Sequence, residues 1–367
     1  CNLTHTGSIE EFVRVYGECG HFLKPALYTF SPEAVREFFR IRQLEAKEEK
    51  DGCVFPITDR ASDVCRILVD TARRLTVEFV YGRRVQAIEK EADGFQIQTD
   101  KQILRAPSVI IATGGASWPF TGSTGDGWRL AKEFGHTIMP PRAALCPLVT
   151  EQTWPGRLQG VGIADVVLQA AWDKKSIRLR GPLMCTADGI GGPVVFDLSR
   201  HLTETLAEPA SAVQITADFL PSMDRPCAEA WLIAECAAQP RKEMAGVLSA
   251  RLPRQLCLLL EEFVSPGRPV TAAHLTKEQR NRMLEYIKAM PLTVIKTAPL
   301  EQATVTRGGV SRQEIDSKTM QSRNCAGLFF AGEVIDADGP CGGYNLQIAW
   351  STGALAGAAA ARPDCRV

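Results

Sequence analysis

The feature that most constrains the fold is a segment near the C-terminus in which an apolar strand ends in glycine and a helix begins after two further glycines. The apolar run 328–331 is followed by Gly332 and Glu333, and Gly342-Gly343 precedes a helix predicted over 344–361. A glycine at a strand end permits close approach of a ligand. The carboxylate of Glu333 can accept hydrogen bonds from a sugar or ribitol hydroxyl.

The start of the predicted helix offers backbone hydrogen-bond donors. We expect the amides of Asn345, Leu346 and Gln347 to face outward without an intrahelical acceptor. With the positive end of the helix dipole, such donors suit a negatively charged ring edge, such as that of a reduced flavin. The pattern favours a cofactor site, although an ordinary strand, loop and helix that close a sheet, with Glu333 in solvent, would also produce it.

A second run points to a ligand edge. Residues 108–111 are mostly β-branched, and Thr113, Gly114 and Gly115 follow. Such runs are typical of a strand covered on both faces in a parallel sheet, and ligands lie beyond the carboxyl ends of such strands. The Gly-rich loop 121–127 then leads into a helix predicted over 128–134. A buried strand followed by a flexible polar loop is the alternative interpretation.

The remaining patterns predict mixed α and β structure. In the first part of the chain, helices are predicted from Ser31 and after Asp59, a strand is predicted over 77–81, and a hairpin is predicted from 85–90 and 94–99. Farther along, strands are predicted over 166–172 and 193–198, with a bend at 189–192, and helical packing is predicted over 227–290.

Charge and cysteine content exclude several classes of function. The 42 Lys and Arg residues balance 42 Asp and Glu residues, so the chain lacks the basic excess typical of nucleic-acid or anionic-membrane binding. The apolar stretch 349–361 is too short to span a membrane. The 12 cysteines contain no Cys-x-x-Cys pair, which disfavours metal sites and fits reduced thiols. We therefore expect a cytoplasmic protein with a small-molecule substrate, no nucleic-acid partner, no membrane association and no metal.

Several motifs, taken in order, resemble the HI0933-like family of FAD-dependent oxidoreductases, also described as aminoacetone oxidase-like or BaiN-like. They are the segments 111–119, 121–127, 181–193, 305–310 and 331–347. The resemblance implies an α/β fold with a Rossmann-like FAD-binding domain over 1–145 and 305–367, an inserted β-barrel-like domain over 146–220 and 290–304, and a small helical domain over 221–289. It also implies that a first βαβ unit with the GxGxxG turn precedes Cys1.

The resemblance implies the cofactor-binding residues. Cys1, Asn2 and Leu3 would border the FAD, Val85 would lie near its adenine, and Thr113 and Gly114 would close over it. Gly332 would let the cofactor approach beside Glu333, which would hold the ribitol. Gly343 would precede the helix at which Asn345, Leu346 and Gln347 meet the isoalloxazine. No catalytic residue is assigned, because the run 186–193 lacks the His and Ser that the family often has there. Trp118 stands where Tyr is common.

The implied activity is hydride exchange between flavin N5 and a small organic substrate. Two versions stay open: an oxidase that passes electrons from an amine such as aminoacetone to O₂, and a C=C reductase with NAD(P)H as the electron donor. A flavoprotein-derived RNA-binding or structural module is the non-enzyme alternative, which the neutral charge disfavours.

Three further residues have side chains that could take part in chemistry. We expect Cys341 to be an inert thiol, because no partner cysteine lies near it in sequence. His5, the histidine nearest to a predicted flavin segment, is expected to be structural. Arg307 either binds an anionic substrate or pairs with a carboxylate.

Overall fold

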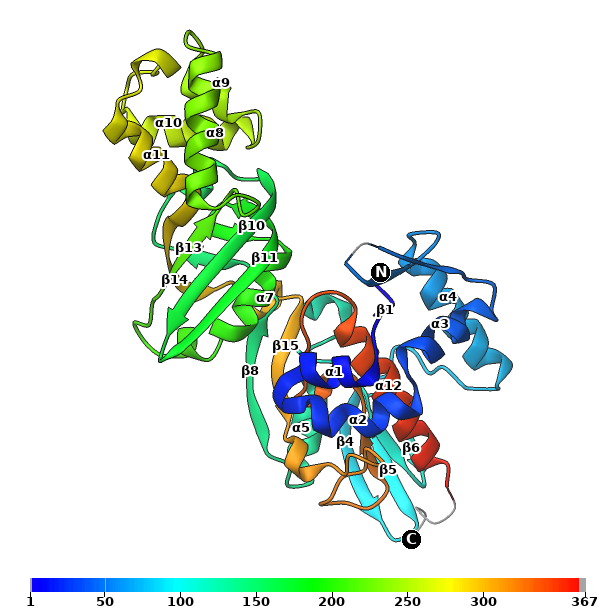
Figure 1. Ribbon diagram of the computed structural model, residues 1–367. Helices are drawn as coiled ribbons and strands as arrows, with labels where there is room; N and C mark the ends of the chain where they lie inside the picture. The colour runs from blue at the N-terminus through cyan, green and yellow to red at the C-terminus, as the bar shows by residue number, and fades with distance from the viewer. Residues whose placement is uncertain (1, 50, 363–367) are drawn as a thin grey trace. The chain divides into compact units, whose positions relative to one another are not determined.

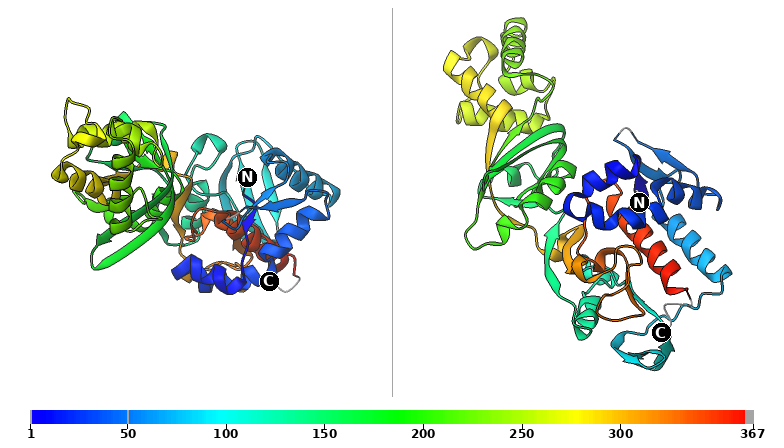
Figure 2. Two further views of the ribbon diagram at one scale, coloured as in Figure 1. Left: turned by 45° about the horizontal axis from the view of Figure 1, so that its top comes forward. Right: turned by 60° about the horizontal axis from the view of Figure 1, so that its bottom comes forward.

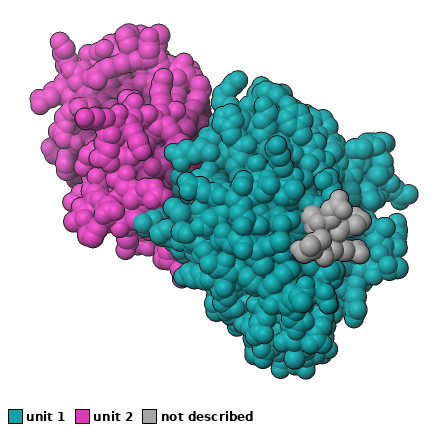
Figure 3. Space-filling view, turned by 90° about the horizontal axis from the view of Figure 1, so that it is seen from below, with its two compact units in different colours: residues 1–142, 304–367 teal, residues 143–303 magenta. Residues whose placement is uncertain are grey.

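The chain divides into two units, which Figure 3 colours separately. The computed structural model describes residues 2–49 and 51–362. The first unit comprises residues 1–142 and 304–367, and the second comprises residues 143–303. This division places the predicted β-rich and helical segments in the same unit.

Two parallel strands lie at the centre of the first unit. β7 (Val109–Ile111) pairs in parallel with β16 (Leu328–Phe330), so segments from opposite halves of the chain meet. Phe329 and Phe330 are fully buried, whereas Ile110 is 38% exposed. The predicted strand at 108–111 is therefore confirmed, but the prediction that it is covered on both faces is wrong.

The long helix α12 (Tyr344–Ala360) packs against α2 (Gly20–Thr29), as the views of Figures 1 and 2 agree. The short strand β1 (Thr4–His5) also contacts α12. Small residues such as Ser351 and Ala356 are buried on α12, which lets neighbouring backbone approach closely. The helix predicted after Gly343 is confirmed.

Two predicted helices form a side cluster of the first unit. α3 (Pro32–Arg40) begins at Ser31, whose hydroxyl accepts the amide of Ala34 at 3.2 Å, and Pro32 occupies the first helical position. α4 is Ala61–Arg74. Their apolar faces meet around Val35, Phe39, Val64 and Ile67, together with Leu3. Both helix predictions are confirmed.

The predicted hairpin is present, but the strand predicted before it is wrong. β4 (Val85–Glu91) pairs antiparallel with β5 (Gly94–Thr99), and β6 (Ile103–Ala106) continues this sheet. Residues 77–81 form no strand. Phe79 and Tyr81 stack on each other at 5.8 Å, and Tyr81 is 69% exposed. The segment has the β-branched and aromatic residues typical of a strand, but it pairs with no strand among the described residues.

The other elements of the first unit surround this core. They are α1 (Ile9–Tyr16), α5 (Asp126–Glu133), β2 (Ala46–Glu48), β3 (Cys53–Pro56), β8 (Ile138–Ala144), which leads into the second unit, and β15 (Val305–Val310). β1, β3 and β2 form one small sheet, and β15 pairs with β8. The helix predicted over 128–134 is confirmed as α5.

The second unit is a closed barrel with helices attached (Figure 1). Its strands, in order around the barrel, are β10 (Gly162–Trp172), β11 (Lys175–Thr186), β12 (Gly189–Gly191), β9 (Leu148–Thr150), β14 (Met290–Thr297) and β13 (Val213–Asp218). Its helices are α6 (Trp154–Arg157), α7 (Pro193–Leu202), α8 (Arg225–Ala238), α9 (Met244–Leu248), α10 (Arg254–Val264) and α11 (Lys277–Ala289). The strand at 166–172 and the helical packing over 227–290 are confirmed.

Two predictions in the second unit are wrong. Residues 193–198 were predicted as a strand but begin helix α7, and residues 189–191 were predicted as a bend but form β12. Gly192, with φ of +91°, precedes Pro193 at the first helical position. Val194, Leu198 and Leu202 are buried at helical spacing, so tertiary packing outweighs the β propensity of the valines.

The start of α12 depends on the absence of a side chain at Gly343. Its φ is +95°, and an added Cβ would lie 2.4 Å from the carbonyl oxygen of Thr4 and 2.7 Å from Oδ1 of Asn2. By contrast, a Cβ at Gly353, in the middle of the same helix, would meet nothing within 4 Å.

We predict opposite effects of alanine at these two glycines. Gly343→Ala should lower the free energy of unfolding by at least about 1 kcal/mol, because it adds backbone strain and a clash with β1. Gly353→Ala should raise it by about 0.5–1 kcal/mol, since alanine favours a helix interior. Denaturant unfolding followed by circular dichroism measures both. Equal effects of the two substitutions would contradict the role of Gly343.

Candidate functional site

The candidate residues of the two parallel strands lie at one sheet edge. Thr113 and Gly114 follow β7, and Gly332 and Glu333 follow β16, so both pairs are at the carboxyl edge. Gly114 and Gly332 have φ of +74° and +73°. The amide of Gly332 donates to Oγ1 of Thr352 at 2.9 Å, which joins this edge to α12.

Glu333 is held by the protein at this edge and is not a solvated acid. The amide of Thr306 donates to its Oε1 at 2.6 Å, and Ser117 and the amide of Gly115 also hydrogen-bond to the carboxylate. Burial raises the pKa of Glu333 above its usual value, and these hydrogen bonds offset only part of that shift. A Cβ at Gly115 would lie 2.4 Å from Oγ1 of Thr306, so glycine is required there.

The first turn of α12 is built differently from the sequence prediction in one respect. The amide of Gln347 donates to the carbonyl of Gly343 at 3.0 Å, so the prediction that this amide is unpaired is wrong. The amides of Asn345 and Leu346 precede it in the first turn, where α-helical geometry supplies no acceptor. The Asn345 side chain accepts the amide of Gly339 at 2.8 Å and donates to its carbonyl at 2.9 Å.

The N-terminal candidates lie against α12. The amide of Leu3 donates to the carbonyl of Val54 at 2.7 Å, and its carbonyl accepts the indole N–H of Trp350 at 2.9 Å. Oδ1 of Asn2 is buried without a hydrogen-bond partner among the described residues. It lies 2.7 Å from the position that a Cβ of Gly343 would take. Cys1 falls outside the described residues.

Val85 is not brought to this cluster by any described hydrogen bond. It lies at the start of β4, where its carbonyl accepts from Nη2 of Arg129 at 3.3 Å, and its side chain packs against the core that includes Ile111 and Phe330. Arg307 lies 3.9 Å from a carboxylate oxygen of Asp338. Of the two roles considered for Arg307, the structure thus contains the pairing with a carboxylate.

Two residues of the site, Thr4 and Cys53, were not identified from the sequence. Thr4 donates from Oγ1 to Oε1 of Gln347 at 2.6 Å. The adjacent His5, which we expected to be structural, stacks on Tyr344 with ring centroids 4.7 Å apart. Cys53 lies beside Gly342, whose added Cβ would be 3.3 Å from its sulfur. No local sequence signal marks these residues, because their partners lie hundreds of positions away.

Cys53 is distant from Cys341 in sequence, but its sulfur lies near Gly342, the residue that follows Cys341. Burial raises the pKa of the Cys53 thiol to about 11, so it is protonated at neutral pH. Because the thiolate is the nucleophile, Cys53 is an unreactive thiol. Among the described residues, no group of three or more His, Cys, Asp or Glu side chains could hold a metal ion. Among the described helices, none is long and apolar enough to cross a bilayer.

The residues around Gly343 fit a flat ring that donates one N–H and carries negative charge at one edge. Oδ1 of Asn2 supplies an acceptor without a partner in the described structure. The amides of Asn345 and Leu346 supply donors at the positive end of a helix. Gly343 keeps the backbone open between them. The backbone at Gly343 therefore has a hydrogen-bond acceptor on one side, at Asn2, and donors on the other, at Asn345 and Leu346.

We predict that Glu333→Gln changes how stability depends on pH. A carboxylic acid whose pKa is raised on folding loses stability as pH rises from its unfolded pKa, with an ordinary value of 4.5, through its folded pKa. Gln keeps an acceptor for Thr306 but does not titrate. The stability of the variant relative to the wild type should therefore increase with pH over that window. Denaturant unfolding between pH 4 and 8 tests this, and parallel pH profiles would refute it.

The chain matches one family model and several known proteins along most of its length. A family model described as HI0933-like protein Rossmann domain matches residues 1–359. The chain is 33% identical over 361 residues to a 3-dehydro-bile acid delta(4,6)-reductase of Clostridium scindens, covering 98% of this chain and 87% of that protein. It is 28% identical to ribosomal RNA dihydrouridine synthases of Escherichia coli (93% of this chain, 84% of that protein) and Haemophilus influenzae (90% and 80%).

Among solved structures, Escherichia coli quinol fumarate reductase FrdA, in a mutant form, aligns with a TM-score of 0.45 and 13% identity. The alignment covers 100% of this chain and 65% of that one. The family match extends over nearly the whole chain and includes both the sheet edge and the start of α12. The chain therefore belongs to the HI0933-like Rossmann-domain family, and it is an FAD-dependent oxidoreductase.

Proposed function

We propose that the protein reduces a C=C bond conjugated to a carbonyl group in a small-molecule substrate, with FAD bound between the sheet edge and the start of α12. The observation that carries the placement of FAD is the buried Oδ1 of Asn2, which lacks a partner among the described residues and lies beside Gly343. A flavin ring carries an N–H that such an acceptor suits. Bound FAD would supply hydride transfer to the substrate.

Each candidate residue has a distinct task in this proposal. Asn2 would accept a hydrogen bond from the ring, and the first-turn amides at Asn345 and Leu346 would stabilise negative charge at its edge. Glu333, whose carboxylate is already held by Thr306, would orient a ribitol hydroxyl. Thr113 and Gly114 are at the same edge and would border the cofactor.

The names of the relatives favour the reductase over the amine oxidase. One relative is named as a delta(4,6)-reductase and two are named as dihydrouridine synthases. Dihydrouridine is uridine in which a ring C=C bond next to a carbonyl has been reduced. Both names therefore describe the same chemical class of reaction. We propose NAD(P)H as the electron donor for this chain.

Reduction of uridine in RNA is the second candidate function. The two dihydrouridine synthases favour it, since they match along most of this chain. The balance of 42 basic against 42 acidic residues disfavours an extended nucleic-acid interface. The relative with the higher identity acts on a bile acid by its name, and we therefore place the small-molecule substrate first.

We predict that Asn2→Ala weakens FAD binding without destabilising the apoprotein. Loss of one hydrogen bond to the ring should raise the dissociation constant for FAD by about five- to tenfold. Thermal unfolding without FAD should shift little, because removal of a buried acceptor without a partner offsets the loss of the side-chain hydrogen bond to Cys53. Fluorescence titration with FAD measures the affinity. Unchanged affinity with lower apoprotein stability would mean that Asn2 is purely structural.

The reaction class is tested with FAD-loaded protein. NAD(P)H should be oxidised only when an acceptor is present, either a 3-oxo steroid with conjugated double bonds or a uridine-containing RNA, and no hydrogen peroxide should form. Turnover of the steroid alone supports the small-molecule substrate, and turnover of the RNA alone supports the second candidate. Peroxide formation from an amine without nicotinamide would overturn both reductase versions.

A further inference from the structure

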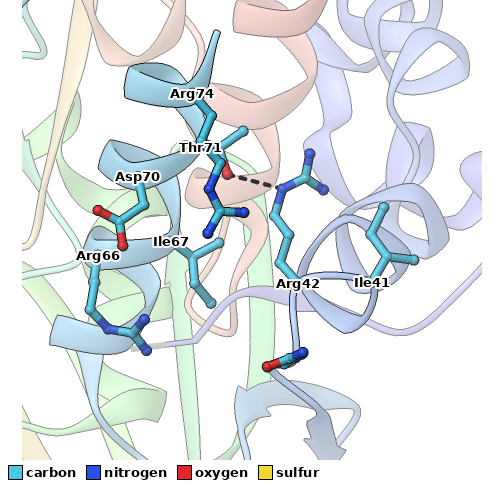
Figure 4. Close-up of a pocket in the computed structure, with 8 residues that line it drawn as sticks. Ile41, Arg42, Arg66, Ile67, Asp70, Thr71 and Arg74 are labelled. Carbon is cyan, nitrogen blue, oxygen red and sulfur yellow. Dashed lines mark hydrogen bonds between the residues drawn. The ribbon is translucent and has the colours of Figure 1, made fainter.

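A polar cavity of the first unit shares no residue with the candidate flavin site. It lies between the turn after α3 and one face of α4, and Figure 4 shows its lining side chains. Its volume is about 210 Å³, and its lining residues are Ile41, Arg42, Gln43, Arg66, Ile67, Asp70, Thr71 and Arg74. The helical spacing of Arg66, Asp70 and Arg74 places all three on the same face of α4.

The lining of this cavity, which we call the arginine pocket, is strongly basic. Three of its residues are arginines and one is an acid, in a chain whose total charge is zero. Asp70 lies 3.9 Å from Arg73, which is outside the pocket. Its charge is thus shared with a fourth arginine, and the lining residues themselves carry an excess of positive charge.

Arg42 is held in place by contacts that leave part of its guanidinium for a ligand. Its Nε donates to Oγ1 of Thr71 at 3.0 Å, and Nη1 donates to the carbonyl of Phe38 at 2.8 Å. The guanidinium also lies over the Phe38 ring, 3.8 Å from its centroid. Since a guanidinium has five N–H donors, Arg42 retains donors beyond these two hydrogen bonds and has already lost most of its side-chain freedom.

The other two arginines are weakly engaged. Arg66 lies 3.3 Å from Asp63 in an exposed pair, and such pairs contribute little. The side chain of Arg74 has no ion pair or hydrogen bond with residues 2–49 and 51–362. Figure 4 shows the side chains of Arg42 and Arg74 extending into the same space from the α3 turn and from α4. Like charges that approach in this way repel each other unless an anion lies between them.

We propose that the arginine pocket binds the phosphate group of a nucleotide, either free or within an RNA strand. Phosphate oxygens match the planar donors of arginine, and the pocket offers three such groups. Ile41, which is 60% exposed, and Ile67 add apolar surface for a sugar or base. This inference does not rest on the proposed reductase activity, because it concerns binding by residues outside the flavin site.

The geometry favours a free nucleotide over an RNA strand. One cavity of this size holds one or two phosphates, whereas a single strand is bound along a basic groove with aromatic side chains for its bases. Acidic residues such as Glu33, Glu37 and Glu45 line or adjoin the neighbouring hollow around Arg36 and Arg40. The basic lining of the arginine pocket therefore does not continue into this hollow as a uniformly basic groove.

The experiment is titration calorimetry of the protein, saturated with FAD, against ADP, inorganic phosphate and a short single-stranded RNA. Arg74→Gln and Arg66→Gln should each raise the dissociation constant for ADP by about tenfold, as expected for loss of one charge-assisted hydrogen bond. The matched control is Arg60→Gln, an exposed arginine just before α4 that does not line the pocket, and it should leave the affinity unchanged.

The arms of the titration separate the sources of the phosphate. Binding of ADP and inorganic phosphate that both pocket variants weaken supports a free nucleotide. Binding of RNA alone, weakened by the same variants and with a salt dependence reduced by about 0.7 per lost phosphate contact, assigns the phosphate to RNA. Binding that all three arginine variants weaken equally, or no binding of any probe, would overturn the proposal. Repeating the ADP titration without FAD shows whether the result depends on flavin binding.

Discussion

The fully buried side chain of Gln347 joins three distant parts of the chain, and the architecture of the first unit depends on it. Its Oε1 accepts from Thr4 in β1, and its Nε2 donates to the carbonyl of Phe30 and to Ser351. Each polar atom of the side-chain amide has a hydrogen-bond partner, and these bonds compensate for the desolvation of the buried amide. Loss of any partner would leave a buried polar group unpaired. The start of α12 is thereby fixed against the N-terminal strand.

The sheet edge is connected to α12, the helix that carries Gln347, through small residues that allow the two backbone segments to approach each other. Thr352 on α12 binds the amide of Gly332, and Glu333, the next residue, is held by Thr306. The carboxylate position is thus determined by α12 on one side and β15 on the other. A flexible acid would lose side-chain entropy on binding a cofactor, whereas this carboxylate is already ordered. This ordered position requires partial burial of the carboxylate, and burial raises the pKa of Glu333.

Much of the local structure could be predicted from the sequence, because its signals lie within a few residues. Ser31-Pro32 marks the start of α3, and Asp93-Gly94 marks the hairpin turn. The predictions failed where non-local packing decides. Val194 and Val195 have high β propensity, yet residues 193–198 begin a helix because one face of α7 is buried in the barrel core. In the candidate site, the glycines and Glu333 carried signals, whereas Thr4 and Cys53 acquire their positions only through tertiary contacts.

The arginine pocket also shows why total charge is a weak guide to binding partners. Charges in solution are screened over about 8 Å at physiological ionic strength, so a ligand responds to the few groups within that distance. A neutral sum of 42 against 42 therefore coexists with a local excess at Arg42, Arg66 and Arg74. Neutrality removes the contribution of net charge to steering a polymer, but it does not exclude one strong anion site. A chain of this composition is accordingly suited to recognise a compact anion at a local cluster of arginines.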